Sequence, residues 1–122
     1  MPPADPVQIP PETALRMLRE MIATLVRRDG PVLSGHQLAV FMTCYLVDGP
    51  HTVRGLAADL KVSKSVVTRS LDKLGELDLT RRAPDPSDRR SVLVERTPGG
   101  LALLVQLRDA AGTAVSAHAA AA

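Results

Sequence analysis

Apolar side chains recur at steps of three and four residues along much of the chain, which is typical of the buried face of an α-helix. The pattern predicts a first helix from residue 12 to a turn at residues 29–31. A second helix, capped by Ser34, ends at residues 48–50, and a short third helix covers residues 53–60. The apolar residues of the three helices are Leu15, Leu18, Ile22 and Leu25; Leu38, Phe41, Met42 and Tyr45; and Val53, Leu56, Ala57 and Leu60.

A fourth helix follows after a connection of only three residues, and Ser63 is its expected N-cap. Its apolar residues Val67, Leu71 and Leu74 share one face, so we expect them to point into the core. The opposite face is short and polar. It consists of Ser65, Thr68, Arg69 and Asp72.

Beyond residue 78 the pattern changes to that of short strands. Residues 79–83 and 91–96 are predicted to form a β-hairpin, because residues 84–88 between them are rich in proline, aspartate and serine. Thr97 and Pro98 then predict the start of a last helix, whose small and apolar side chains are Leu101, Leu104, Leu107, Ala111 and Ala114. This order predicts a mainly α fold with a hairpin, an α+β winged helix.

The composition fits one small domain with an aliphatic core. Of the 122 residues, 45% are hydrophobic but only Phe41 and Tyr45 are aromatic, which argues against an aromatic platform for single-stranded nucleic acid. Residues 1–11 contain five prolines and are interpreted as an N-terminal arm before a single domain at residues 12–122. The single cysteine, the lack of a signal-peptide pattern and the absence of a long apolar run predict a cytoplasmic protein away from the membrane.

The positive charge is concentrated in the middle of the chain. The net charge is +2, and residues 54–96 alone hold ten basic and seven acidic side chains, an excess of three. Such a segment is either an ordinary solvated surface or the footprint of a nucleic acid. Charge alone leaves both interpretations open.

The arrangement of the helix pair and the basic hairpin favours duplex DNA. Arg69 can donate two hydrogen bonds to a guanine, while the first turn of its helix, with Lys64, can meet a phosphate. We expect this helix to enter the major groove and the hairpin to lie on the adjacent backbone or minor groove. The candidate DNA-binding residues are Ser63, Lys64, Ser65, Thr68, Arg69, Lys73, Arg81, Arg82, Asp88, Arg89 and Arg90.

These residues resemble the winged helix of the MarR family of transcriptional regulators over residues 53–100. The matching segments are residues 56–60, 62–69, 74–77, 85–90 and 97–100. The wing signature of the family falls on Asp88, Arg90, Thr97 and Gly100. The resemblance implies that Arg90 enters the minor groove, that Asp88 steadies it, and that residues 63–69 begin the recognition helix.

The chain departs from the family pattern at three places. Lys61 stands where the family usually has glycine, and a lysine in a left-handed conformation there costs about 1 kcal/mol. Arg96 replaces the usual leucine before Thr97. The family usually carries two C-terminal helices, and this sequence is interpreted as a short variant with one.

Self-association is expected because the first and last helices each carry an apolar stripe. We predict a homodimer built from these helices, with Met17 and Met21 as further exposed side chains on the first. A set of small residues in the last helix is either helix-forming filler or a close-packed dimer seam. It comprises Ala110, Ala111, Ala114 and Ala117.

Other candidate sites carry less weight in the sequence. Cys44 is interpreted as a structural thiol, with oxidant sensing as the alternative. His36, His51 and His118 have no metal-ligand spacing, and no catalytic motif occurs, so we expect no enzyme activity, metal or cofactor. The residues give no support for a small-molecule effector. The rival function is a winged-helix protein-interaction module.

Overall fold

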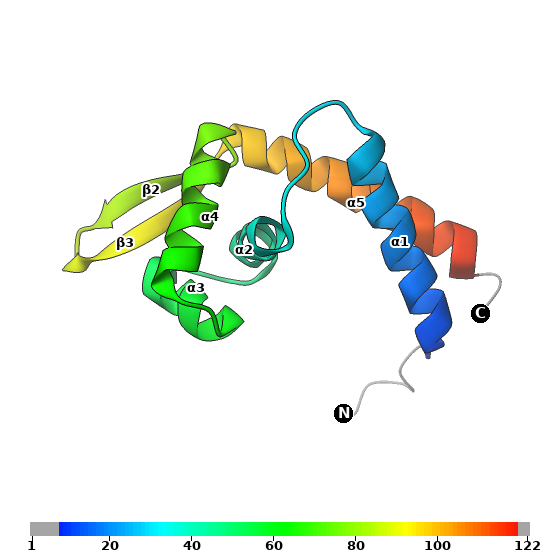
Figure 1. The fold of residues 1–122 in the computed structure, drawn as a ribbon, viewed down its shortest axis with the longest axis horizontal. Coiled ribbons are helices and arrows are strands. Elements are labelled where there is room, and N and C mark those ends of the chain that lie inside the picture. Colours follow the sequence, from blue (N-terminus) through cyan, green and yellow to red (C-terminus); the bar gives the residue numbers. More distant parts are fainter. Residues whose placement is uncertain (1–7, 120–122) are drawn as a thin grey trace. The chain divides into compact units, whose positions relative to one another are not determined.

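The computed structural model describes residues 8–119, which form five helices and a small antiparallel sheet (Figure 1). The elements are α1 (Pro11–Arg27), α2 (Gly35–Leu46), β1 (His51–Thr52), α3 (Val53–Leu60), α4 (Lys64–Glu76), β2 (Thr80–Asp85), β3 (Asp88–Arg96) and α5 (Pro98–Ala119). The winged-helix order expected from the sequence is confirmed. Most of the proline-rich arm expected at residues 1–11 lies outside the described residues, and Pro11 already belongs to α1.

The chain divides into two compact units, which are described separately. The larger unit is Leu33–Val105, and the smaller unit comprises α1 with the part of α5 from Gln106 onward. The first turns of α5 therefore belong to the larger unit and its last turns to the smaller one.

The sheet of the larger unit has three strands in the order β1-β3-β2. The hairpin is longer than predicted, because residues expected in the turn continue the strands and only Pro86 and Ser87 remain between them. Pro84 is tolerated because β2 lies at the edge of the sheet. Ser87 donates from its hydroxyl and its backbone N–H to Asp85 Oδ1, which holds the pKa of that carboxyl below its usual range.

The strand β1 was not predicted. It is only two residues long, and His51 and Thr52 pair with Val94 and Leu93 of β3. Thr52 then caps α3, because its hydroxyl accepts a hydrogen bond from the backbone N–H of Gly55 at 2.9 Å. The start of α3 is thereby tied to the middle of the hairpin.

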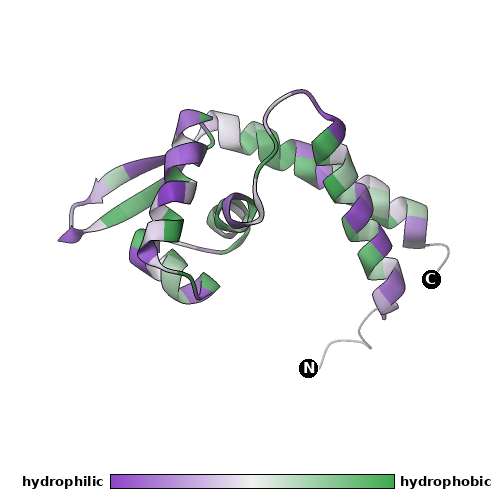
Figure 2. Cartoon of the chain, in the orientation of Figure 1, coloured by the Kyte–Doolittle hydropathy of each residue, from purple (hydrophilic) through white to green (hydrophobic). Residues whose placement is uncertain are grey.

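The core of the larger unit is mostly aliphatic, as expected. It is built around α2, which carries both hydrophobic and hydrophilic positions (Figure 2) and buries Val40, Phe41, Cys44 and Tyr45. The predicted inner face of α4 is confirmed, since Val67, Leu71 and Leu74 are all buried. The largest fully buried side chains are Phe41, Leu56, Leu71, Leu74, Val40 and Val67.

Two glycines allow α5 to start against the end of α2. The hydroxyl of Tyr45 donates to Leu79 O at 2.7 Å and accepts from Thr97 N at 2.9 Å. A Cβ atom at Gly100 would overlap both the Tyr45 hydroxyl and Leu79 O, and one at Gly99 would press on the backbone of Asp78. The glycine of the wing signature is thus required by close packing.

The two other departures from the family pattern have a structural explanation. Lys61 is left-handed, with φ 55°, and ends α3, so the cost of about 1 kcal/mol expected for a residue with a Cβ applies there. Arg96 keeps its charge at the surface. Its Nε donates to Cys44 O at 3.0 Å, and its guanidinium lies 5.4 Å from the ring centre of Tyr45.

In the smaller unit, one residue of α1 that was predicted to be exposed is buried. Met17, expected to be exposed, is buried with 7% of its surface accessible, so that expectation was wrong. Of the apolar stripe predicted on this helix, Leu15, Leu18 and Ile22 are exposed at 60%, 47% and 46%, and Val26 is exposed beside them at 56%. Ala110 and Ala114 of α5 are buried within the same chain.

Candidate nucleic-acid interface

The outer face of α4 is polar and held by a capped N-terminus. Ser63 accepts a hydrogen bond from Val66 N at 3.2 Å, as an N-cap should. Lys64, Ser65 and Arg69 are exposed, while Thr68 is half-buried. Backbone N–H groups of this first turn point out of the helix end, which favours an anion there.

The wing places two arginines at the start of β3. Arg89 and Arg90 are exposed, and the carboxylate of Asp88 accepts from Arg90 N at 3.0 Å and from the Ser91 hydroxyl at 3.1 Å. Asp88 therefore steadies the backbone that carries Arg90. This contact fixes where the arginine side chain leaves the strand.

Three of the predicted basic residues are neutralised by carboxylates. Lys73 lies 3.7 Å from Glu76 on α4, and Arg81 lies 2.9 Å from its cross-strand neighbour Glu95. Arg82, on the opposite face of β2, forms an ion pair with Asp72 of α4. Such exposed pairs contribute about 0–1 kcal/mol to stability, but they leave these cations less available to an external anion.

The remaining cations are not paired in this way. Among the described residues, no carboxylate lies within ion-pair distance of Lys64, Arg69, Arg89 or Arg90. Two of these residues belong to the recognition helix and two to the wing. The positive charge available to a partner is thus split between both elements.

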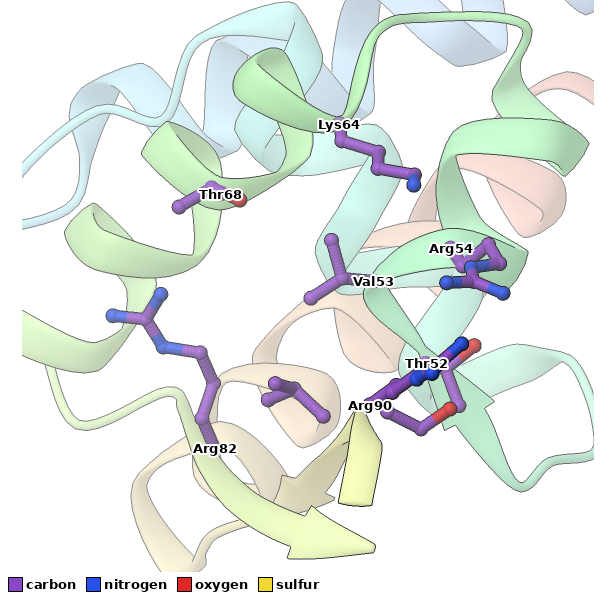
Figure 3. Close-up of a pocket in the computed structure, with 9 residues that line it drawn as sticks. Thr52, Val53, Arg54, Lys64, Thr68, Arg82 and Arg90 are labelled. Carbon is purple, nitrogen blue, oxygen red and sulfur yellow. The ribbon is translucent and has the colours of Figure 1, made fainter. Parts of the chain in front are cut away.

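A concavity of about 260 Å³, here called the basic hollow, lies between α3, α4 and the hairpin (Figure 3). It joins Lys64 and Thr68 of α4 to Arg82 and Arg90 of the hairpin. The other predicted site residues do not line it. Its full lining is Thr52, Val53, Arg54, Lys64, Thr68, Arg82, Arg90, Ser91 and Val92.

Arg54 is the charged lining residue that the sequence analysis did not predict; Thr52, Val53, Ser91 and Val92 were also not predicted. Arg54 lies in the first turn of α3, directly after β1, and its place beside Arg90 depends on the pairing of β1 with β3. A two-residue strand gives no periodic signal. The concentration of basic residues from position 54 onward was the available hint.

Cys44 lies away from these surfaces and is 3% exposed. Burial raises the pKa of its thiol to about 11, while the nearby charge of Arg96 acts in the opposite direction. The thiol is therefore protonated at neutral pH, and a protonated thiol is a poor nucleophile.

We expect the folded protein to react with a thiol reagent such as Ellman's reagent at least roughly 100-fold more slowly than the urea-unfolded protein at pH 8. The time course of thiolate release gives both rates. Equal rates, or loss of DNA binding by peroxide that Cys44→Ser abolishes, would contradict the structural interpretation and favour a sensor.

Residues 8–119 hold neither a candidate metal cluster nor a candidate membrane-spanning helix. No three histidine, cysteine, aspartate or glutamate side chains between residues 8 and 119 lie where they could share a metal ion. In that same part of the chain, every helix is too short or too polar to cross a bilayer.

A three-helix core with a tight turn before α4 and a basic hairpin behind it defines a winged helix-turn-helix protein. The model of the MarR family matches residues 33–92, which include α2, α3, α4, β2 and most of the exposed wing. This part of the chain is similar to the MarR family, and the resemblance seen in the sequence is confirmed. No curated protein sequence matches it.

Solved structures share this fold. The transcriptional regulator Tm0710 of Thermotoga maritima is 23% identical with a TM-score of 0.73, over 86% of this chain and 71% of that one. A mutant MarR of Escherichia coli complexed with operator DNA is 27% identical with a TM-score of 0.65, over 83% of this chain and 69% of that one. A mutant MepR of Staphylococcus aureus bound to an oligodeoxyribonucleotide is 19% identical with a TM-score of 0.68, over 80% of this chain and 70% of that one.

Proposed function

We propose that this protein is a DNA-binding transcriptional regulator that places α4 in the major groove and its wing in the minor groove. The observation that carries the proposal is the basic hollow, where Arg54, Lys64 and Arg90, none of them ion-paired among the described residues, line one concavity that has no carboxylate in its lining. Convergent cations from a recognition helix and a hairpin are suited to the phosphates of a duplex. The family relatives MarR and MepR are described in complexes with DNA, which supports the same function.

The outer face of α4 favours DNA over the rival interaction module. A protein-binding surface needs large apolar or aromatic anchors. Among the described residues, none of the exposed large hydrophobic side chains lies on α4. Its exposed residues include Lys64, Ser65, Arg69 and Asp72.

Within this proposal the candidate residues have different roles. Arg69, with Ser65 and Thr68, reads base edges, because these side chains share the outer face of α4. Ser63 and Lys64 meet a phosphate at the helix N-terminus, and Arg89 and Arg90 extend from the wing. Lys73, Arg81 and Arg82 form ion pairs within the protein and support the interface without contacting DNA. Asp88 positions the backbone of the wing.

The function is tested by letting the purified protein choose a duplex from a random library. We expect successive rounds to enrich one sequence with two inverted half-sites about 10 base pairs apart or a multiple of that. The variant Arg108→Ala, at an exposed position of α5 outside the interface, should enrich the same sequence. A library that stays random at low salt would contradict sequence-specific binding and favour the protein-interaction module.

We also propose that the protein is a homodimer through α1 and α5. On α1, an exposed stripe at steps of three and four residues supports a partner surface; it consists of Leu15, Leu18, Ile22 and Val26. Val115 of α5 is also half-exposed. Exposed apolar stripes of this length are unfavourable in water unless another surface covers them.

Sedimentation velocity at micromolar concentration should give a dimer for the wild-type protein. Leu18→Glu should shift it to monomer, because the dimer would bury the added carboxylate. The adjacent change Arg19→Glu alters the charge more but lies beside the stripe, so it should remain dimeric. A wild-type protein that stays monomeric under these conditions would contradict the dimer.

A further inference from the structure

The basic hollow is more than part of a diffuse positive surface, because its cations come from separate elements and meet in one concavity. Arg54 belongs to α3, Lys64 to α4 and Arg90 to β3. Figure 3 shows the side chains of Lys64 and Arg54 on the helix side and that of Arg90 on the hairpin side near Thr52, whereas Arg82 rises from the hairpin toward α4.

The cations of the hollow are not equivalent. Arg82 is already bound by Asp72, which lies outside the lining. Within residues 8–119, no carboxylate lies within ion-pair distance of Arg54 or Lys64. These two side chains therefore keep their full charge for a bound anion, and Arg90 adds positive potential on the wing side.

The rest of the lining suits a small, hydrogen-bonding anion. Thr68 and Thr52 bring hydroxyl groups to the hollow. The hydroxyl oxygen of Thr52 accepts from Gly55 N, which leaves the hydroxyl hydrogen to be donated to an anion. Val53 and Val92 form apolar parts of the wall. An apolar wall displaces water, which strengthens the attraction between an anion and the cations.

We propose that the basic hollow seats one backbone phosphate of the bound duplex, with Arg54 and Lys64 as the residues that contact it. The inference rests on the proposed function and adds Arg54 to the interface. A phosphate bound there contacts Arg54 of α3 and Lys64 of α4, next to the wing. It fixes the register of the recognition helix along the backbone, and it carries no information about the base sequence.

Arg54 is placed for this role by the short strand that precedes it. The pairing of β1 with β3 and the Thr52 cap fix the start of α3, so Arg54 leaves the first helical turn beside the hairpin. Its contribution is one of position. A cation elsewhere on the surface would add charge without reaching the same phosphate.

The test couples single charges on the protein to single phosphates on the DNA. The duplex is the one enriched from the random library, synthesised with one phosphate at a time replaced by a neutral methylphosphonate. We expect wild-type affinity to fall about tenfold at one phosphate in each half-site, the loss typical of one charge-assisted hydrogen bond. Arg54→Gln should lose a similar factor on the unmodified duplex. The methylphosphonate at that same position should then weaken its binding clearly less than it weakens the binding of the wild type, because only the contact with Lys64 remains to be lost.

Two variants make the comparison specific. Arg54→Lys keeps the charge and should retain sensitivity to that phosphate. Arg89→Gln removes one exposed wing cation outside the hollow. Its fold-loss of affinity and that of the methylphosphonate at the hollow should therefore be independent, and the two factors should multiply. Circular dichroism and sedimentation of each variant establish that it is folded and assembled as the wild type is.

The outcomes separate this inference from the proposed function. If the fold-losses of affinity caused by Arg54→Gln and by every methylphosphonate simply multiply, the binding of a phosphate in the basic hollow is refuted while DNA binding stands. If inorganic phosphate at fixed ionic strength saturates the free protein in the micromolar range, without coupling to any duplex phosphate, the hollow belongs to a free anion and the inference is also overturned. A library that yields no sequence refutes the proposed function itself.

Discussion

Replacing Gly100 by alanine is expected to destabilise the protein by roughly 3 kcal/mol. The added Cβ would overlap the Tyr45 hydroxyl and Leu79 O. Forcing atoms into a packed region typically costs 1–3 kcal/mol. Moving the Tyr45 hydroxyl also breaks buried hydrogen bonds to Leu79 O and Thr97 N, at about 1–3 kcal/mol for each group left unpaired.

Gly112 provides the matched control, because it lies in the same helix and an added Cβ there meets no atom within 4 Å. Gly112→Ala should stabilise the protein by about 0.5–1 kcal/mol through the helix propensity of alanine. Urea unfolding followed by circular dichroism measures both changes. A Gly100→Ala protein as stable as the wild type would show that α5 does not start against Tyr45 as described.

Arg69→Ala and Arg90→Ala should weaken DNA binding in different ways. Arg69 lies on the outer face of α4, where a guanidinium can fork onto a guanine, so its loss should cost roughly 1–3 kcal/mol on the selected site and relax the preference at one base pair. Arg90 lies at the wing beside the basic hollow. Its loss should weaken all duplexes evenly and make the salt dependence shallower by about one phosphate per subunit.

Fluorescence anisotropy with the selected duplex and a scrambled duplex, each at several salt concentrations, separates the two effects. Thermal unfolding of both variants serves as the control for folding, and neither change should alter it because both side chains are exposed. If both variants remain folded and bind both duplexes like the wild type, recognition by these two residues is refuted.

The parts of the fold that local chemistry determines could be predicted from the sequence. Ser63 and Thr97 were identified as caps, because a hydroxyl before a helical pattern accepts the backbone N–H groups of the first turn. The inner face of α4 followed from the spacing of Val67, Leu71 and Leu74. The wing followed from a proline- and aspartate-rich turn between two short alternating segments.

The features that depend on contacts between distant residues could not. The ion pair of Arg82 with Asp72 joins a strand to a helix ten residues earlier, and nothing in the spacing specifies it. The place of Arg54 depends on a two-residue strand without periodicity. Met17 was predicted to be exposed because an apolar stripe identifies a helix surface that can associate. Which side of that helix the rest of the chain covers depends on packing, which the stripe does not specify.

The central claim is that the positive surface of α4, the wing and the basic hollow binds the phosphates of duplex DNA. The most direct measurement is the affinity of the wild-type protein for a random-sequence duplex as a function of salt. The logarithm of the binding constant should fall linearly with the logarithm of the salt concentration, by at least roughly 100-fold between 50 and 200 mM. Absence of binding at 50 mM salt, or an affinity that salt leaves unchanged, would contradict the claim.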